Sequence, residues 1–351
     1  MNSLLPPAAM LPGPEQATAQ IAWHVVGEAV WAPSVYNTQP WWFSADSAGL
    51  SLYADPARQL PAADPVGREM LISCGAALFT ARLALRAAGY VPREQILPDP
   101  ARPLLIARLS WERGPAATRY ERRLSAGVRV RRAHRGGFDP LPLAPELLGV
   151  LQECASRYGA VLRVITHEGT RAALAEVVQE AERALERDSA HVRELTAWTA
   201  PPGSRRDDGV PATAYPARPE PTFPYFPGRD FARGRGWGRP PLSMLPGRSA
   251  GVVCLLATSA DQPADWINAG QALQRILLTS TAWGVAAALH SQPFELSWGR
   301  GLMRSRPGLH PQLLLRLGTT VQTAAGVRRP PGSVLFTSGR EPVPPGSPPA
   351  R

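Results

Sequence analysis

The sequence predicts an α+β protein made of two tandem halves that pack together as an intramolecular pseudo-dimer. The first observation is a repeated helical segment, Gly-Ala-Ala-Leu at 75–78 and Gly-Gln-Ala-Leu at 270–273. The second is a repeated apolar run, Pro-Leu-Leu-Ile-Ala-Arg-Leu at 103–109 and Pro-Gln-Leu-Leu-Leu-Arg-Leu at 311–317. Both pairs occur in the same order, so internal duplication explains them better than the chance similarity of Ala- and Leu-rich helices.

Spacing identifies the elements of the first half. A helical pattern from Gln20 to Trp31 stops at Pro33, which cannot continue a helix, and a strand ending near Tyr53 follows. Leu71, Leu78 and Leu85 recur at a helical spacing, and the glycine at position 89 is typical of a helix C-cap. The run at 103–109 is short and apolar, which predicts a buried strand.

The second half repeats this plan in part. Gly284 follows the repeated segment at 270–273 as the C-cap glycine does in the first half, and 311–317 is the matching buried strand. The segment Glu-Ala-Val-Trp-Ala-Pro-Ser at 28–34 has a degraded partner in a helix around 146–157. Packed against each other, two such units would form a seam, where ligands commonly bind.

Composition sets the expected boundaries. Residues 1–14 and 339–351 are rich in Pro and small residues, which predicts poorly ordered tails. The N-terminal half is expected at 15–125 and the C-terminal half at 126–338. The C-terminal half should carry a Pro-, Gly- and Arg-rich insertion at 200–248.

A connection as long as this insertion is either a functional lid or disordered. Its aromatic residues, among them Tyr215, Phe226 and Phe231, favour a lid that packs on the rest of the protein. The run Arg-Gly-Arg-Gly-Trp-Gly-Arg at 233–239 leaves open another function, the binding of nucleic acid.

The charge of the chain favours anionic ligands. Among its 351 residues, 38 are basic and 28 acidic, which gives a net charge of +10, and every basic side chain other than histidine is arginine. Such a bias accompanies an Ala- and Pro-rich composition, so it is weak evidence for nucleic acid. Arginine nevertheless suits phosphate, because its planar guanidinium can donate two hydrogen bonds to one phosphate group.

Cysteine and histidine usage indicates neither a disulfide framework nor a metal site. Cys74, Cys154 and Cys254 are far apart in apolar runs, so we expect buried thiols in a reducing cytoplasm. The histidines lack metal-ligand spacing. The N-terminus lacks a basic region before its apolar residues, and no apolar stretch approaches the ~20 residues needed to span a bilayer, so we expect no membrane partner.

The segment Ala-Pro-Ser-Val-Tyr-Asn-Thr-Gln-Pro-Trp-Trp-Phe at 32–43 carries the strongest functional signal. Ser34, Asn37 and Gln39 favour loops because their side chains compete for backbone hydrogen bonds, and prolines stiffen both ends. Such a loop is suited to presenting polar groups to a heteroaromatic ring. From the residues alone, a helix–strand turn anchored by a core tryptophan explains the pattern equally well.

This segment resembles the signature loop of the FMN-dependent nitroreductase family. In that family the loop contacts the flavin from the opposite subunit of the dimer. The resemblance implies flavin contacts here from five loop residues, namely Pro33, Ser34, Val35, Asn37 and Gln39.

A second family element opens the other half. Arg-Arg-Ala-His-Arg-Gly-Gly-Phe at 131–138 resembles the family's first basic motif, with Ala133 in place of the usual Ser and one extra residue before the Phe. The resemblance implies that Arg131, Arg132 and Arg135 bind the phosphate, the ribityl chain and the pyrimidine edge of FMN.

The C-terminal half supplies the remaining family elements. The helix at 269–284 fits the family pattern, and Arg328 and Arg329 resemble the late basic pair near the phosphate. Ser291 and Gln292 fall where the family places its loop beside the reactive N5 of the ring. The loop occurs only in the first half and the arginines only in the second, which implies one complete site across the seam. This arrangement resembles the Acg-type single-chain branch over most of residues 17–336.

The resemblance implies an NAD(P)H-dependent oxidoreductase that transfers hydride through FMN to an electron-poor acceptor such as a nitroaromatic or a quinone. No catalytic acid or base is identified from the sequence. A closed FMN-binding protein that stores or sequesters flavin is the alternative, and a nucleic-acid-binding protein is a distant third. We expect a monomer that forms its own pseudo-dimer, or a weak homodimer.

Overall fold

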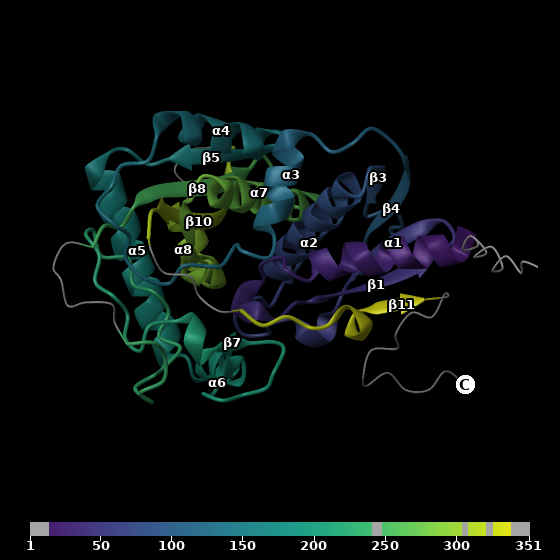
Figure 1. The fold of residues 1–351 in the computed structure, drawn as a ribbon. Helices are drawn as coiled ribbons and strands as arrows, with labels where there is room; N and C mark the ends of the chain where they lie inside the picture. The colour runs from purple at the N-terminus through teal and green to yellow at the C-terminus, as the bar shows by residue number, and fades with distance from the viewer. Residues whose placement is uncertain (1–13, 241–247, 304–307, 321–325, 338–351) are drawn as a thin grey trace, which may run out of the picture.

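The computed structural model describes residues 14–240, 248–303, 308–320 and 326–337, and it confirms the predicted α+β class. The predicted C-terminal tail, residues 1–13 of the predicted N-terminal tail and residues 241–247 of the insertion lie outside this range. Figure 1 shows two mixed parts, one from the first third of the chain and one from the rest, which meet along α2 and α7.

The first part begins with α1 and forms a five-stranded sheet. Its elements are α1 (Pro14–Ala29), β1 (Trp41–Asp46), β2 (Gly49–Ala54), α2 (Arg68–Ala87), β3 (Tyr90–Ile96), β4 (Leu105–Arg113) and α3 (Arg119–Gly127). The strand order is β11-β1-β2-β4-β3, antiparallel except that β11 (Leu335–Thr337) lies parallel to β1. The end of the described chain therefore completes the first sheet (Figure 1).

One detail of this sheet differs from the prediction. A hairpin of β1 and β2 stands where the sequence predicted one strand ending near Tyr53. The Asp46 carboxylate accepts a hydrogen bond from the backbone N–H of Ala48 at 2.8 Å, and Gly49 has a φ of +141°. An aspartate that bonds the backbone two residues ahead is a turn signal, and it reverses the chain here.

The second part forms a four-stranded antiparallel sheet in the order β5-β8-β10-β9. Its elements are α4 (Pro145–Ser156), β5 (Ala160–Val164), α5 (Glu168–Arg187), α6 (Ser189–Ala197), β6 (Thr199–Ala200), β7 (Val210–Pro211), β8 (Val252–Thr258), α7 (Pro263–Ala282), β9 (Ala286–His290), α8 (Ser297–Met303) and β10 (His310–Gly318).

The two parts share one order of elements. The series α1-β1-β2-α2-β3-β4 corresponds to α4-β5-β8-α7-β9-β10, and the strand orders β1-β2-β4-β3 and β5-β8-β10-β9 correspond as well. The main difference lies between β5 and β8, where α5, α6, β6 and β7 intervene, and a smaller one lies between β9 and β10, where α8 has no counterpart between β3 and β4. The second part therefore departs from the shared order of elements before residue 200, the position at which the sequence predicted the insertion to begin.

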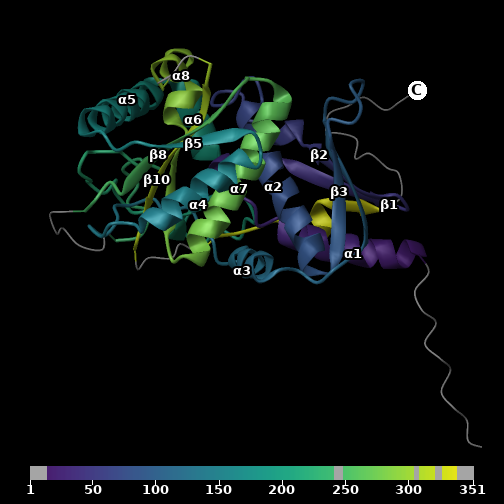
Figure 2. The same cartoon turned by 90° about the horizontal axis from the view of Figure 1, so that it is seen from above.

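The helices α2 and α7 cross with their backbones in close contact (Figure 2). A Cβ atom added to Gly75 would lie 2.0 Å from the carbonyl oxygen of Ile267, and one added to Gly270 would lie 2.0 Å from that of Ile72. Each glycine thus meets the residue three positions before the other glycine. This reciprocity is the pattern of a two-fold interface.

The helix α2 also has the length and apolar character of a membrane span. This differs from the prediction that no apolar stretch of the chain is long enough to span a bilayer. Most of its side chains, however, are buried inside the protein, as in the core helix of a globular fold. The three cysteines are free and buried, as predicted. Within the described ranges, no group of three His, Cys, Asp or Glu side chains is placed to hold a metal ion.

Candidate functional site

A cavity of about 170 Å³ lies where the two parts meet. By the same measure, one water molecule needs ~10–15 Å³, so the cavity has room for a ligand of many atoms. Its walls come from the loop after α1, the start of α2, residues 131–135, the insertion, the end of β9 and the segment before β11.

Most of the site residues predicted from the sequence line this cavity together. They are Pro33, Ser34, Val35, Asn37, Arg131, Arg132, Arg135, Ser291, Gln292 and Arg328. Gln39 and Arg329 are not among the lining residues. The insertion adds a wall of its own, which includes Val210, Arg229 and Phe231.

The loop after α1 is held in an uncommon backbone conformation. Tyr36, Asn37 and Gln39 have φ values of 49°, 57° and 51°, in the left-handed region that side chains other than glycine seldom adopt. The Ser34 hydroxyl accepts a hydrogen bond from the Gln39 N–H at 2.9 Å. The Asn37 amide donates to the carbonyl oxygens of Gly209 and Val327 at 2.9 and 3.1 Å. These bonds fix the loop against the insertion and the C-terminal segment.

The hydrogen bonds of Gln39 explain why its side chain does not line the cavity. Its side chain is fully buried, and its amide nitrogen donates to the carbonyl oxygen of Asp207 at 2.9 Å. Its amide oxygen accepts from the backbone N–H of Arg329 at 2.8 Å. Gln39 therefore connects the loop to two distant segments, and its amide is fully used in doing so.

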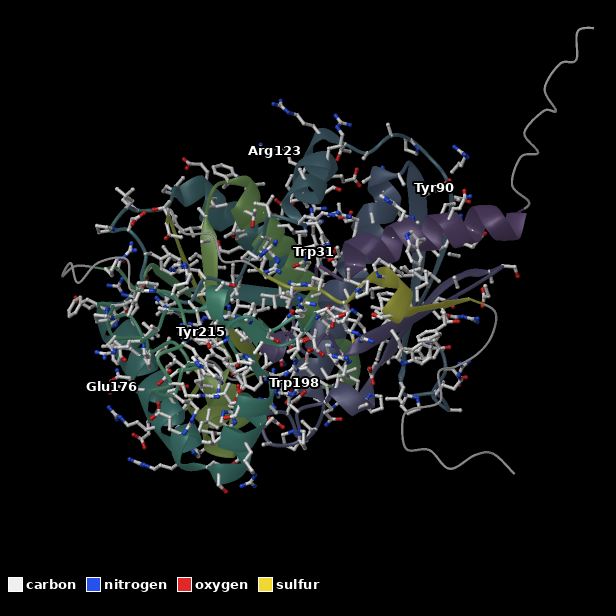
Figure 3. All side chains as sticks on the ribbon, turned by 60° about the horizontal axis from the view of Figure 1, so that its bottom comes forward. Trp31, Tyr90, Arg123, Glu176, Trp198 and Tyr215 are labelled. Carbon is white, nitrogen blue, oxygen red and sulfur yellow. The ribbon has the colours of Figure 1, made fainter. Side chains whose placement is uncertain are left out.

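Four arginines gather on one side of the cavity, namely Arg131, Arg132, Arg135 and Arg328. Arg132 and Arg328 stack on the two-ring side chain of Trp31, with guanidinium carbons 4.9 and 5.4 Å from a ring centre. Figure 3 labels Trp31 near the middle of the molecule, where the two parts meet.

These arginines lack acidic partners. In the part of the chain that the structure describes, no carboxylate forms an ion pair with any of the four. The Nε atoms of Arg131, Arg132 and Arg328 are buried and have no hydrogen-bond acceptor among the described residues. Buried charges are normally paired, so the buried parts of these guanidinium groups favour the binding of an anion in the cavity.

The lowered pKa values of these arginines also favour a bound anion. Burial, and then the nearby charges of Arg132 and Arg135, lower the pKa of Arg131 to about 10. Burial and the other three arginines hold the pKa of Arg328 well below its ordinary value. Burial, and then Arg239, lower the pKa of Arg135 to about 10. A bound anion would remove part of this mutual destabilisation.

A second buried network joins the insertion to the rest of the site, and the sequence reasoning missed it. Arg229 of the insertion donates to the Glu295 carboxylate at 2.6 Å and lies 2.7 Å from Nε2 of His191. The Tyr36 hydroxyl lies 3.4 Å from Glu295, and the Ser291 hydroxyl donates to Glu295 at 2.7 Å. Burial and Arg229 lower the pKa of His191 to about 3, so its ring is neutral. No motif links these residues, and only the folded chain brings them together.

Glu69 is another lining residue that the sequence did not single out. It stands in the first turn of α2, is 4% exposed, and accepts a hydrogen bond from Arg68 at Oε1 over 2.8 Å. Its Oε2 is buried and lacks a hydrogen-bond partner among the described residues. Burial raises the pKa of Glu69 well above its ordinary range, while Arg68 opposes that rise.

Fold and site together define an α+β protein with an arginine-lined cavity between two similar parts. Comparison with known proteins then gives the family, although no protein-family model matches. The chain is 32% identical to "Putative NAD(P)H nitroreductase Rv3131" of Mycobacterium tuberculosis over 294 residues, covering 83% of this chain and 82% of that protein. The chain belongs to the nitroreductase family, as the sequence predicted.

Other relatives and solved structures are similar to the chain. "Uncharacterized protein Rv3127" of Mycobacterium tuberculosis is 31% identical, with 87% of this chain and 89% of that protein covered. "Putative NAD(P)H nitroreductase acg" of the same organism is 28% identical, with coverage of 88% and 93%. The solved nitroreductase A of Vibrio parahaemolyticus has a TM-score of 0.39 and 10% identity, covering 63% of this chain and 78% of that one.

Proposed function

We propose that this protein is an FMN-dependent oxidoreductase that takes hydride from NAD(P)H and passes it to an electron-poor acceptor, a nitroaromatic or a quinone. The observation that carries the proposal is the cluster of four arginines on the cavity wall, of which Arg131 is only 4% exposed, and for which the described residues offer no acidic partner. Relatives named as NAD(P)H nitroreductases, and the resemblance of the loop at 32–43 to the signature of the FMN-dependent nitroreductase family, support the choice of FMN as the anion.

The residues present fit this cofactor. Arg131, Arg132 and Arg328 would hold the phosphate, because their buried Nε atoms have no other described acceptor. Arg135, whose guanidinium carbon lies 5.2 Å from the centre of the Phe231 ring, would lie beside the ribityl chain or the ring. When bound, FMN would supply the acceptance and donation of two electrons.

The loop after α1 would position the ring. Pro33, Ser34 and Val35 line the cavity, and the bonds from Ser34 and Asn37 keep the backbone of the loop fixed. Apolar lining residues, among them Ile72 and Leu273, would exclude water from the flat faces of a flavin. In this proposal Gln39 and Arg329 support the loop and do not touch the cofactor.

We further propose that the two parts arose by duplication and together form one site. Their common strand order and the reciprocal contacts of Gly75 and Gly270 support this reading. The proposal includes a chain that acts as a monomer or a weak homodimer, and a cytoplasmic location, which the buried free cysteines favour.

A second function is favoured by one observation, the wall that the insertion adds to the cavity. Arg229 and Phe231 line it, and the buried ion pair of Arg229 with Glu295 fastens the insertion to the second part. A fastened lid could keep reductant out and make the protein a store of FMN.

One experiment tests both functions. The purified protein should be yellow, and mass spectrometry of the released cofactor should identify FMN. Mixing with NADPH or NADH without oxygen should bleach the flavin, and a quinone should restore the colour. Bound FMN that neither reductant bleaches would favour storage. A colourless protein that does not bind added FMN would refute both functions.

A further inference from the structure

We propose that Glu69 is the residue that donates a proton to the acceptor during its reduction. The inference rests on the proposed function, because it concerns the acceptor that the cavity would take. It assigns a catalytic acid where the sequence alone identified none.

The position of Glu69 is fixed by the start of α2. The carboxylate of Asp64 accepts a hydrogen bond from the Met70 N–H at 2.8 Å and so caps the first turn. Arg68 donates to Glu69 and also to the backbone and side-chain oxygens of Gln312, at 2.8 and 3.1 Å. The guanidinium of Arg68 further lies over the Phe294 ring. Glu69 is therefore held on the cavity wall by a partner that is itself immobile.

The charged groups that act most strongly on Glu69 differ from those that act most strongly on the arginine cluster. The charged groups that act on it are Arg68 on its own helix, Asp64 just before that helix, Glu295 of the second part and Arg229 of the insertion. The Tyr36 hydroxyl lies close enough to be influenced by Glu69 in turn. The groups that act on Arg131 are other arginines, Arg132 and Arg135. With a phosphate among the arginines, Glu69 would stand toward the part of the cavity left for the acceptor.

The surroundings of Glu69 stabilise both the neutral acid and the charged carboxylate. Burial, together with the nearby carboxylates of Glu295 and Asp64, favours the neutral acid before the reaction. Arg68 and the N-terminal end of α2 stabilise the carboxylate that remains after the proton has left. A group that can hold a proton and tolerate its loss is what general acid catalysis requires.

The chemistry balances with a quinone acceptor. The quinone takes up two electrons as hydride, which originates from NAD(P)H, and one oxygen then carries negative charge. The O–H bond of the Glu69 carboxyl breaks, a new O–H bond forms on the quinone oxygen, and the electron pair of the broken bond remains on Glu69. Solvent returns one proton to Glu69. Per quinone, NAD(P)H and one proton give NAD(P)⁺ and a hydroquinone.

The test compares the holoenzyme with Glu69→Gln and with a matched control, Glu94→Gln. Glu94 is also a carboxylate with a raised pKa and an arginine partner, Arg82 at 3.2 Å, but it lies on β3 and is not among the cavity-lining residues. Three quantities are measured, namely the Kd for FMN, the rate of flavin bleaching by NADPH without oxygen, and the rate of recolouring by 1,4-benzoquinone across pH.

Glu69→Gln should keep FMN affinity and bleaching near the wild-type values and slow recolouring by about 10²–10⁴-fold. In the wild type and in Glu94→Gln, recolouring should slow as pH rises through the pKa of Glu69. The infrared difference spectrum of the oxidised and reduced holoenzyme should contain a protonated-carboxyl band that Glu69→Gln removes and Glu94→Gln keeps.

Recolouring by Glu69→Gln at the wild-type rate, or an infrared band that survives the substitution, would overturn the inference while leaving the proposed function intact. Failure of the wild type to bind FMN would refute the proposed function and the inference with it. Should Glu69→Gln not fold, the wild type still decides, because a recolouring rate that does not depend on pH excludes Glu69 as the acid.

Discussion

Replacing Arg131 with methionine should have opposite effects on the stability of the cofactor-free protein and on its affinity for FMN. Burial lowers the pKa of Arg131 from the ordinary value of an arginine to about 10, and one pKa unit corresponds to ~1.4 kcal/mol. The charged guanidinium therefore costs the folded, cofactor-free protein about 3 kcal/mol. Methionine removes the charge, fills similar space, and gives up the hydrogen bond from Arg131 to the Trp31 carbonyl, worth ~1 kcal/mol. The net expectation is a gain in free energy of unfolding of about 2 kcal/mol.

Binding of FMN should weaken in the same variant. A charge-assisted hydrogen bond contributes ~1.5–3 kcal/mol, so its loss should raise the Kd by about 10- to 150-fold. The assay is denaturant unfolding of protein stripped of FMN, paired with FMN titration by fluorescence quenching at fixed salt.

Arg129→Met is the matched control. Arg129 lies two positions before Arg131, but its side chain is 62% exposed and paired with Glu28. Removing it should change stability by no more than ~0.5 kcal/mol, as is usual for surface substitutions, and affinity by less than about twofold. A cofactor-free Arg131→Met protein that is less stable than the wild type, with unchanged FMN affinity, would refute the view of this cluster as an unpaired anion site.

Other substitutions separate support from binding. Gln39→Leu should leave the Asp207 carbonyl and the Arg329 N–H unpaired, and so lower the free energy of unfolding in urea by about 1–3 kcal/mol. In an FMN titration, the same variant should change the Kd less than Arg131→Met does. Glu295→Ala should lower the free energy of unfolding by about 3–5 kcal/mol, because it leaves the buried charge of Arg229 unpaired. Tyr36→Phe removes only a hydrogen bond to Glu295 and should lower it by ~1 kcal/mol. Equal losses in the two variants would contradict the view that the ion pair fastens the insertion. Burial lowers the pKa of His134 to about 4, so the unfolded chain takes up this proton at a higher pH than the folded chain does. The free energy of unfolding should therefore fall by roughly 3 kcal/mol as pH drops from ~6.5 to 4. A His134→Gln variant should lose that part of the pH dependence of its urea midpoint.

The sequence predicted the family, the α+β class and most residues that now line the cavity, because those features depend on local patterns. The loop at 32–43 and the arginines at 131–135 are each contiguous, so their chemistry is visible before the chain folds. Their meeting in one cavity agrees with the prediction that two similar halves pack across a seam.

The features that escaped prediction depend on contacts between distant positions. Gln39 looks like a ring-contacting amide, but Asp207 and Arg329 occupy its side chain, and neither could be paired with it from spacing. The pair of Arg229 and Glu295 joins the insertion to a short helix far along the chain. Glu69 reads as an ordinary acidic residue in the first turn of a helix, and only burial beside the cavity gives it another role.

The connection lengths support the proposal that the two parts arose by duplication and together form one site. In the first part, α1 ends at Ala29 and β1 begins at Trp41, which leaves room for the polar loop. In the second part, α4 ends at Ser156 and β5 begins at Ala160, so no comparable loop can form there. A homodimer must repeat every charge at both of its sites, whereas one chain can place its arginine cluster at a single site. The prediction is one FMN per chain, and a flavin-to-protein ratio near two would require a second loop that the chain does not have.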